Sequence, residues 1–517
     1  MTLSAVLIDT VSIQEYVYSS NKLKENIGAS FLVKKIYDDV LKEALKQTFG
    51  KDIDINEWRK PKEIKIAQGN DEVEIGYIGG GNALVLFKDK DKTLEFIKNY
   101  TKLLLIKTPG LRTAFGVSHD FDLNNFENSM ENLHKNLREN KNQYFPNVTL
   151  PKYGFTLDCP RTNESAEAFE DEDKKFISSV SRAKLKYSDE AKNEIMNEGE
   201  IINEGEMTNK IKDILKDKYT LTNDIRKLGQ QKGKDYIAIV FIDGNKMSEK
   251  FANCKNIEEY RELSIKVKNI TVTAFRKMIE KLIYEIENNE IFKNGEFKLE
   301  EEDGKTVLPI RPIVLGGDDI TFISDGRLGV WLAEIFIKEF TNQNIDNEHG
   351  LSACGGVSIV KTKYPFYRAY KLAEDLLEMA KKKSREEDGS YIDFFISSAG
   401  WSGSLEDILV KHLSTVNGKL HFGPYRVDST TDEKSIDNLK NIIKGFKNIP
   451  KNKLMKLREM LFEDKNIAKI YVEELKVKGI NLPRINGMQF HKDLWQDEET
   501  PYFDAIELID FYPEGLL

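Results

Sequence analysis

The chain has 517 residues, of which 40% are hydrophobic and 32% charged, with a formal net charge of −9. This composition excludes a disordered chain, and no apolar run approaches the roughly 20 residues that a membrane-spanning helix needs. The negative charge disfavours attraction of nucleic acid to the whole surface. At roughly 150 residues per domain we expect several folding units, and the start of the chain, without a basic run, predicts a cytoplasmic protein.

The N-terminal part predicts a strand, a helix, a hairpin, a helix and a strand, in that order. A buried strand is expected at 4–8, and apolar residues at helical spacing follow at 21–45. Strands at 75–78 and 83–87 then flank a glycine-rich turn. The last helix and strand are expected at 94–105 and 111–118. The turn itself reads Gly79, Gly80, Gly81, Asn82.

The region 122–234 is strongly charged and has no clear core pattern, so it is interpreted as a helical connector or insert. Its only cysteine is Cys159, and neither Cys254 nor Cys354 lies in a cluster typical of zinc sites. We therefore expect no structural zinc and no disulfide.

The same order of elements returns from Tyr236. The apolar strand 236–243 ends at Asp243, a long amphipathic helix follows, and strands at 308–315 and 320–324 enclose the turn Gly316, Gly317, Asp318, Asp319. Two related α+β domains explain this repeat. The predicted division is 1–121 for the first copy, 122–234 for the connector, 235–400 for the second copy and 401–517 for a mainly helical C-terminal domain.

Asp243, Asp318 and Asp319 are the candidate catalytic and metal-binding residues. Nucleotidyl transfer uses two divalent cations roughly 3.5–4 Å apart, and carboxylates at a strand end and on a neighbouring hairpin tip can converge on one point. Oxygen ligands suit Mg²⁺ or Mn²⁺. Gly316 and Gly317 lack side chains, so their backbone can lie close to a triphosphate. The alternative is a plain surface hairpin, since glycine and aspartate favour turns.

The motifs IDGNKM at 242–247 and VLGGDDITFI at 314–323 resemble the second Palm domain of the type III CRISPR large subunit, which is related to GGDEF nucleotide cyclases. The resemblance implies two ferredoxin-like Palm domains that make cyclic oligoadenylate from ATP. It also implies that a 3′-hydroxyl attacks an α-phosphate beside two metals held by Asp243, Asp318 and Asp319. The first copy resembles the first Palm of that family, which implies a second nucleotide pocket.

Further residues are candidates for nucleotide binding. SACGGVSIV and LAEDLLEMAKKK resemble the last strand and helix of cyclase Palms, in which a helix lysine contacts triphosphate, and Lys381 matches by spacing. A solvated lysine cluster is the alternative. Gly244 and Asn245, after the strand, are placed to contact ribose or phosphate, or to form an ordinary turn. The first-copy turn, Gly79 to Asn82, lacks a carboxylate and is expected to cradle a nucleotide without a two-metal centre. Asp9 ends the first strand, as Asp243 ends its own, with helix capping as the alternative.

The chain also departs from the family pattern. Members usually begin with a histidine–aspartate nuclease domain, whereas here the first Palm strand begins near Met1, so no DNA cleavage is expected. His119 and Asp120 form an isolated pair without other histidines spaced for a metal cluster. The basic run 440–458 is interpreted as a solvated helix face rather than an RNA contact.

The function predicted from the sequence is oligoadenylate synthesis from ATP in antiviral defence. The chain is expected to work with CRISPR effector subunits and guide and target RNA, or as a dimer, and away from membranes. One alternative is a catalytically silent scaffold that binds nucleotide or RNA. Another is a guanine dinucleotide cyclase, which Ile320 disfavours because it stands where that family has its Glu-Phe ending.

Overall fold

A computed structural model of the chain describes residues 2–69, 71–143, 152–162, 164–171, 174–201, 207–229, 235–294, 297–343, 351–397, 403–485 and 488–517. Its residues form two compact units. Unit 1 comprises Met1–Asp224, Lys246–Thr273 and Pro312–Ile320. Unit 2 comprises Ile225–Asn245, Ala274–Arg311 and Thr321–Leu517.

The sheet of unit 1 contains four strands in the order β2-β3-β1-β4. The strands are β1 (Thr2–Val11), β2 (Val73–Gly79), β3 (Asn82–Phe87) and β4 (Arg112–Asp122). β1 runs antiparallel to both β3 and β4, and β2 runs antiparallel to β3. The central strand β1 is buried over most of its length, as its continuous apolar sequence predicts.

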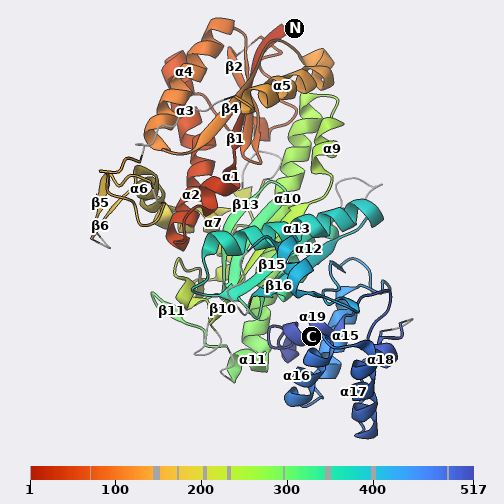
Figure 1. Ribbon diagram of the computed structural model, residues 1–517. Coiled ribbons are helices and arrows are strands. Elements are labelled where there is room, and N and C mark those ends of the chain that lie inside the picture. Colours follow the sequence, from red (N-terminus) through yellow and green to blue (C-terminus); the bar gives the residue numbers. More distant parts are fainter. Residues whose placement is uncertain are drawn as a thin grey trace. The chain divides into compact units, whose positions relative to one another are not determined.

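Helices accompany this sheet in the order typical of a ferredoxin-like fold (Figure 1). They are α1 (Ile13–Tyr18), α2 (Leu23–Lys35), the π-helix η1 (Ile36–Val40), α3 (Leu41–Phe49), the 3-10 turn η2 (Glu57–Arg59), α4 (Lys90–Lys107), the 3-10 turn η3 (Leu123–Asn125) and α5 (Phe126–Lys141). α4 begins where the Asp89 carboxylate accepts the backbone N–H groups of Asp91 and Lys92. α5 packs against β4 and β1, so the first copy continues past the predicted boundary at residue 121.

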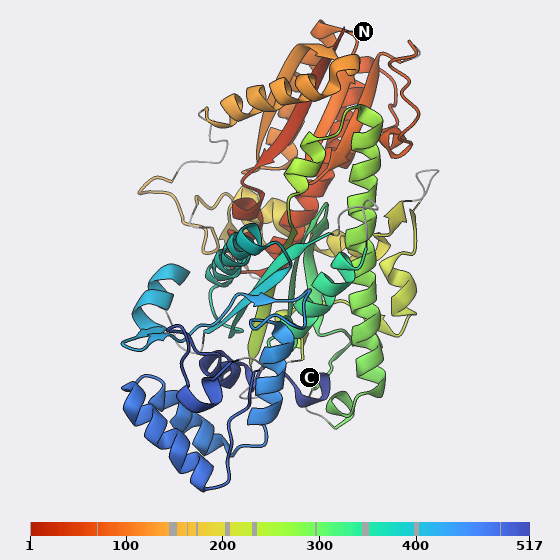
Figure 2. The same ribbon diagram turned by 90° about the vertical axis from the view of Figure 1, so that its right-hand side faces the viewer.

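The rest of unit 1 consists of short elements and of two segments from later in the chain, here called the returning segments. The short elements are β5 (Ala168–Glu170), β6 (Lys175–Ile177), α6 (Ser179–Lys186), α7 (Ser188–Asn197), β7 (Glu200–Ile201), β8 (Met207–Thr208), α8 (Ile211–Leu215) and β9 (Tyr219–Thr220). Arg161 joins this insert to α2 through an ion pair of 2.9 Å with the buried Glu25. The returning segments are α9 (Met247–Ala252) with the first half of α10 (Ile257–Asn288), and residues 312–320. Figure 2 shows α10 in green as one continuous helix.

The second sheet has six strands in the order β13-β14-β10-β15-β16-β19. They are β10 (Tyr236–Gly244), β13 (Ile310–Gly316), β14 (Asp319–Asp325), β15 (Ala353–Lys361), β16 (Tyr391–Ser397) and β19 (Tyr425–Arg426). The first four repeat the order of the unit 1 sheet, and α12 (Gly329–Thr341) and α13 (Phe366–Glu387) take the places of α4 and α5. The predicted α+β fold with two Palm-like copies is confirmed.

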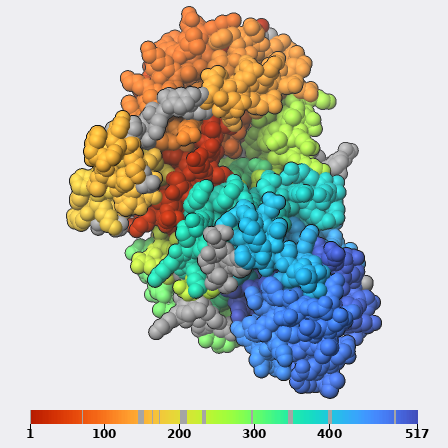
Figure 3. All heavy atoms as spheres, viewed as in Figure 1, coloured from red at the N-terminus to blue at the C-terminus, as the bar shows by residue number. Residues whose placement is uncertain are grey.

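The remaining elements include a mainly helical C-terminal segment, drawn in blue in Figure 3. Before and within the second copy lie η4 (Ile225–Lys227), α11 (Glu290–Lys293), β11 (Glu301–Glu302) and β12 (Lys305–Val307). The C-terminal elements are α14 (Leu405–His412), β17 (Ser414–Thr415), β18 (Gly418–Lys419), α15 (Ile436–Phe446), α16 (Lys451–Met460), α17 (Lys465–Val477), α18 (Phe490–Asp493), α19 (Tyr502–Leu508) and η5 (Glu514–Leu516). β19 joins the sheet, so this segment is not an independent helical addition.

The basic run 440–458 forms α15 and α16. Lys440 pairs with Glu334 at 2.6 Å and Lys451 with Asp510 at 2.6 Å, and Arg458 also forms an ion pair, with Glu507. These three cations are therefore balanced by carboxylates of the chain itself, which accords with a helix face of structural character. In the described part of the chain, no helix combines the length and the apolar character needed to cross a lipid bilayer.

Candidate functional site

A cavity of about 870 Å³ lies within unit 1 and contains the turns of both copies. One wall consists of β1 and the β2–β3 hairpin, another of α5, and a third of α9 and the start of α10. From the first turn, Gly79, Gly80 and Asn82 line it, and from the second turn, Gly317 and Asp318 do. The structure thus brings sequence-predicted residues of the two copies to one cavity.

The glycines permit the two turns to approach closely. Gly80, Gly81 and Gly317 all have positive φ, at 58°, 75° and 60°, which L side chains rarely adopt. A Cβ atom on Gly317 would lie only 3.5 Å from the Cα of Gly80. The Thr271 hydroxyl on α10 also donates to the Gly317 carbonyl at 2.7 Å. Side chains larger than hydrogen at these tips would strain the backbone or fill the space between them.

The first turn is held by backbone and side-chain donors. The Gly81 carbonyl accepts a hydrogen bond of 3.0 Å from the backbone N–H of Thr10 and another from the Tyr37 hydroxyl. Tyr37 and Thr10 are also hydrogen-bonded to each other, at 2.7 Å. This arrangement fixes the turn against the end of β1.

Asp9 lies in the cavity and pairs with a lysine from α5. It stands directly opposite Asn82 in the β1–β3 register, and its carboxylate is 2.6 Å from Lys141 Nζ. Burial raises the pKa of Asp9, while Lys141 opposes that shift. The following helix α1 begins after Ser12, so the alternative of helix capping by Asp9 is not what the structure has.

The second copy contains the same acid–lysine pair in unit 2. Asp243, near the end of β10, forms an ion pair with Lys381 of α13. Asp9 faces Ala114 on β4, and Lys141 comes 27 residues after Ala114; Asp243 faces Cys354 on β15, and Lys381 comes 27 residues after Cys354. The two pairs therefore occupy equivalent positions of the repeat.

Sequence reasoning missed the contribution of α5. His134, Arg138 and Lys141 line the cavity from successive turns of this helix. The signal was present, since the three residues have the spacing i, i+4 and i+7 of one helix face. The predicted domain boundary at 121 separated them from the sheet that they accompany.

Arg261 was also missed. This fully buried arginine of α10 donates to the carbonyls of Gly76 at 2.8 Å and Ile75 at 2.6 Å. It also forms an ion pair of 2.8 Å with the buried Glu74. A residue from the beginning of the second copy thereby holds β2, the edge strand of the first copy's sheet.

Gly244 and Asn245, the two candidates after the second-copy strand, are both buried in the structure. Gly244 ends β10 and is buried. The Asn245 amide donates to the hydroxyls of Ser352 and Ser384, both at 3.0 Å. Contact of Gly244 or Asn245 with a nucleotide stays a prediction, and Asn245 already has a role in joining the start of β15 to the end of α13.

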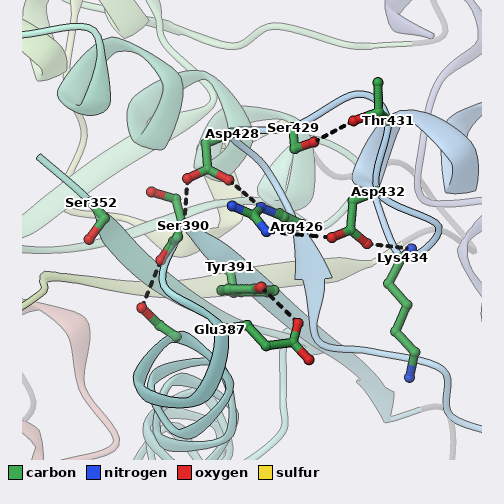
Figure 4. Close-up of polar contacts among 12 residues, drawn as sticks. Ser352, Glu387, Ser390, Tyr391, Arg426, Asp428, Ser429, Thr431, Asp432 and Lys434 are labelled. Carbon is green, nitrogen blue, oxygen red and sulfur yellow. Dashed lines mark hydrogen bonds and ion pairs between the residues drawn. The ribbon is translucent and has the colours of Figure 1, made fainter. Parts of the chain in front are cut away.

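Polar contacts also anchor the loop between α13 and β16 (Figure 4). Arg426 of β19 pairs with Asp428 at 2.8 Å and with Asp432 at 3.6 Å. Asp428 in turn accepts the backbone N–H of Ser390 at 2.9 Å, and the Ser390 hydroxyl accepts the backbone N–H of Ala353 at 3.1 Å. The C-terminal segment thus stabilises the part of unit 2 that surrounds Asn245.

The candidate metal ligands have suitable chemistry. Asp318 and Asp319 are half-buried at the turn, with Asp318 open to the cavity. Asp243 already faces a cation, the Lys381 ammonium, which indicates a position where positive charge is favourable. Within the described ranges, no three His, Cys, Asp or Glu side chains are grouped closely enough to hold a metal. The carboxylates fit a hard divalent cation by donor type.

Comparisons with known proteins agree with the motifs. Residues 236–389 match the family model of the Cas10/Cmr2 second palm domain. No curated protein matches the chain in sequence. Among solved structures, the Csm1–Csm4 cassette in complex with AMPPNP is 14% identical with a TM-score of 0.54, covering 99% of this chain and 69% of that one.

Two further solved structures are similar to this chain to about the same degree. Csm1 from T. onnurineus is 13% identical with a TM-score of 0.54, covering 99% of this chain and 70% of that one. The Csm1–Csm4 cassette in complex with cA3 is 13% identical with a TM-score of 0.52, covering 99% and 69%. At such identities the likeness establishes the fold, which extends over nearly the whole chain.

Proposed function

We propose that this chain, which is a Cas10-like large subunit, joins ATP molecules into cyclic or linear oligoadenylate and releases pyrophosphate. The observation that carries the proposal is the cavity of unit 1, where Asp318 of the GGDD turn and the glycine turn of the first copy line one space. Two nucleotides that must react with each other need such a shared space, because joining them requires close and oriented contact.

In this proposal Asp243, Asp318 and Asp319 hold Mg²⁺ or Mn²⁺. The repeat supports the grouping, since Asp9 and Asn82 lie opposite each other in the first sheet and correspond to Asp243 and Asp319 in the second. A divalent cation bound there would lower the pKa of the attacking hydroxyl and neutralise charge on the leaving pyrophosphate.

Different residues of the chain bind the two nucleotides in this proposal. The donor ATP lies against Gly316 and Gly317, and Lys381 leaves Asp243 to pair with its triphosphate. The acceptor ATP lies in the first-copy part of the cavity, against Gly79, Gly80, Gly81 and Asn82. The 3′-hydroxyl oxygen of the acceptor bonds to the donor α-phosphorus, the bond to pyrophosphate breaks, and the hydroxyl proton is lost to solvent.

The setting of the activity is proposed from the relatives. Their structures include Csm1–Csm4 cassettes and a Csm1–Csm4 subcomplex of a type III-A CRISPR–Csm interference complex. We therefore propose that this chain works with CRISPR effector subunits and responds to guide and target RNA. A nucleotide-dependent defence role follows from that setting.

The test is to incubate the purified chain with labelled ATP or GTP and Mg²⁺ or Mn²⁺, with and without added RNA, and to identify products by mass spectrometry. We expect adenylate oligomers from the wild type and none from Asp318→Ala/Asp319→Ala. Guanine products would point to a dinucleotide cyclase. Absence of product under all conditions, with nucleotide still bound, would replace the synthase by a binding scaffold.

A further inference from the structure

We infer that Asp9 and Asn82 hold the ribose hydroxyls of the acceptor nucleotide, which makes them the residues that position and select its sugar. The inference rests on the proposed function for the presence of an acceptor, and it assigns a role to the first-copy turn, which has no carboxylate. Its elements all lie in unit 1.

The two side chains form a pair suited to a vicinal diol. They are directly opposed on neighbouring antiparallel strands, a spacing at which cross-strand side chains reach a common group. The Asp9 carboxylate can only accept hydrogen bonds, whereas the Asn82 amide can accept or donate. One hydroxyl of a ribose can therefore donate to Asp9 while the other bonds to Asn82.

The Asn82 side chain can still accept a hydrogen bond. Its Oδ1 is buried and has no hydrogen-bond partner among the residues that the structure describes. A buried polar atom without a partner costs free energy, and a bound hydroxyl would remove that cost. Asp9, by contrast, pairs with Lys141 at 2.6 Å through one carboxylate oxygen, and the carboxylate can accept a further hydrogen bond from a ribose hydroxyl.

The surroundings orient the nucleotide. The tip glycines leave space beside this pair, and Gly317 and Asp318 line the same cavity, so a sugar held by Asp9 and Asn82 lies towards the candidate catalytic turn. Arg138 supplies positive charge for the phosphates from α5. Four aromatic residues also line the cavity and offer a surface for the base. Tyr77, Phe126 and Phe251 surround Tyr260, with their ring centroids 4.6 to 6.0 Å from its ring centroid.

The test is a cycle that changes the protein and the ligand together. Binding of ATP and of 2′,3′-dideoxy-ATP is measured by calorimetry in Ca²⁺ on the full chain carrying Asp243→Asn, which stops turnover and weakens the donor site. Addition of Asn82→Ala should weaken the binding of ATP by about fivefold to tenfold, which corresponds to the loss of one neutral hydrogen bond. The affinity for the dideoxy nucleotide should not change. Asn82→Ser, which keeps a hydroxyl, should restore part of the preference.

The control is Asn128→Ala, an exposed asparagine of α5 that does not line the cavity and should change neither affinity. If Asn82→Ala weakened the binding of both nucleotides equally, the inference would be overturned. It would also be overturned if ATP and the dideoxy nucleotide bound equally well both with and without Asn82→Ala. The binding readout is independent of product synthesis. A chain that selects ribose but makes no product would refute the proposed function alone.

Discussion

The two sheets have the same strand order and the same acid–lysine pair, but their hairpin turns differ at two positions. Gly81 and Asn82 stand in the first copy where Asp318 and Asp319 stand in the second. The scaffold that presents the turn is therefore kept in both copies, while only the second turn carries carboxylates of the kind that bind a divalent cation. The comparison teaches that the two copies differ in their turn side chains rather than in their fold, and the proposed division into a catalytic and a binding site rests on those side chains.

The largest effect is expected from removing the carboxylates that distinguish the turns. Asp318→Asn/Asp319→Asn should lower oligoadenylate synthesis at least about 100-fold, because amides replace the ionised ligands of the metals. Asn82→Ala, at the equivalent position of the first copy, should lower it about tenfold or less, the loss of one hydrogen bond. Initial rates at saturating Mn²⁺ measure both.

Both turns are partly exposed, and Asn82→Ala removes a buried oxygen that has no hydrogen-bond partner among the described residues, so these variants should not unfold at a lower temperature than the wild type. A loss of similar size from the two turns would contradict the division of labour.

The second largest effect concerns the link between the copies. Arg261→Met should lower the free energy of unfolding of unit 1 by about 3–5 kcal/mol, because Glu74 would keep a buried charge without its partner. Denaturation in urea, followed by tryptophan fluorescence, measures this change, since Trp58 is buried in unit 1.

Lys266→Met is the matched control, at an exposed lysine on the part of α10 that belongs to unit 1. It should change the free energy of unfolding by less than about 0.5 kcal/mol, as is usual for a surface substitution. Comparable losses from the two variants would show that Arg261 is not the anchor of β2.

Of the two lysines that pair with the strand aspartates, the one in the second copy should matter more for synthesis. The same order is expected for the two turns. Lys381→Met should reduce kcat/KM by about 10- to 100-fold, the value of a charge-assisted hydrogen bond to triphosphate. Lys141→Met should mainly raise the KM for ATP, by a smaller factor, because Arg138 still faces the acceptor phosphates.

The exposed neighbour Lys382 serves as the control, and Lys382→Met should leave kcat/KM within about twofold. Equal effects at Lys381 and Lys382 would favour the alternative of a solvated lysine cluster.

The smallest effect concerns a buried histidine of the C-terminal segment, close to the strand β19 that extends the second sheet. His421 is buried between Asp393 of β16, at 2.9 Å, and Asp504 of α19, at 3.2 Å. Burial opposes its charge, yet the two carboxylates raise the pKa of His421 well above 6.5. The cation therefore stabilises unit 2 fully below about pH 6.5, its pKa when unfolded, and this stabilisation is lost as pH rises through the folded pKa.

Over that window the free energy of unfolding should fall by up to about 1.4 kcal/mol per pH unit. His421→Gln should remove this part of the slope, while the same change at the exposed His412 should preserve it. Urea titrations between pH 6 and 9 provide the comparison, and an unaltered slope in His421→Gln would contradict the assignment.

Much of the fold could be predicted because its strands are apolar and its turns are rich in glycine. The strand ending at Asp243 and the two hairpins lie where the sequence placed them, within a few residues. The role of α5 was harder to predict, because its charged sequence resembles the connector that follows. Arg261 gave no signal, since an arginine on an amphipathic helix is usually exposed and only the folded contacts reveal its burial.

The site could be predicted in part. The motifs identified the GGDD turn, but the meeting of Gly80 and Gly317 depends on contacts between segments more than 200 residues apart. Asn245 was predicted as a nucleotide contact, or as part of an ordinary turn, from its place after a strand. The structure gives its amide internal partners, and the nucleotide contact stays a prediction. The metal-binding role of Asp243, Asp318 and Asp319 stays a prediction.

The most direct measurement is the number of Mn²⁺ ions bound to the full chain in the presence of a non-hydrolysable ATP analogue, determined by electron paramagnetic resonance. The account predicts specific Mn²⁺ binding that is lost in Asp318→Asn/Asp319→Asn and retained in Asn82→Ala. Mn²⁺ binding that survives loss of the GGDD carboxylates, or that disappears when only the first-copy turn is changed, would contradict the claim that the second copy alone is the metal-dependent centre.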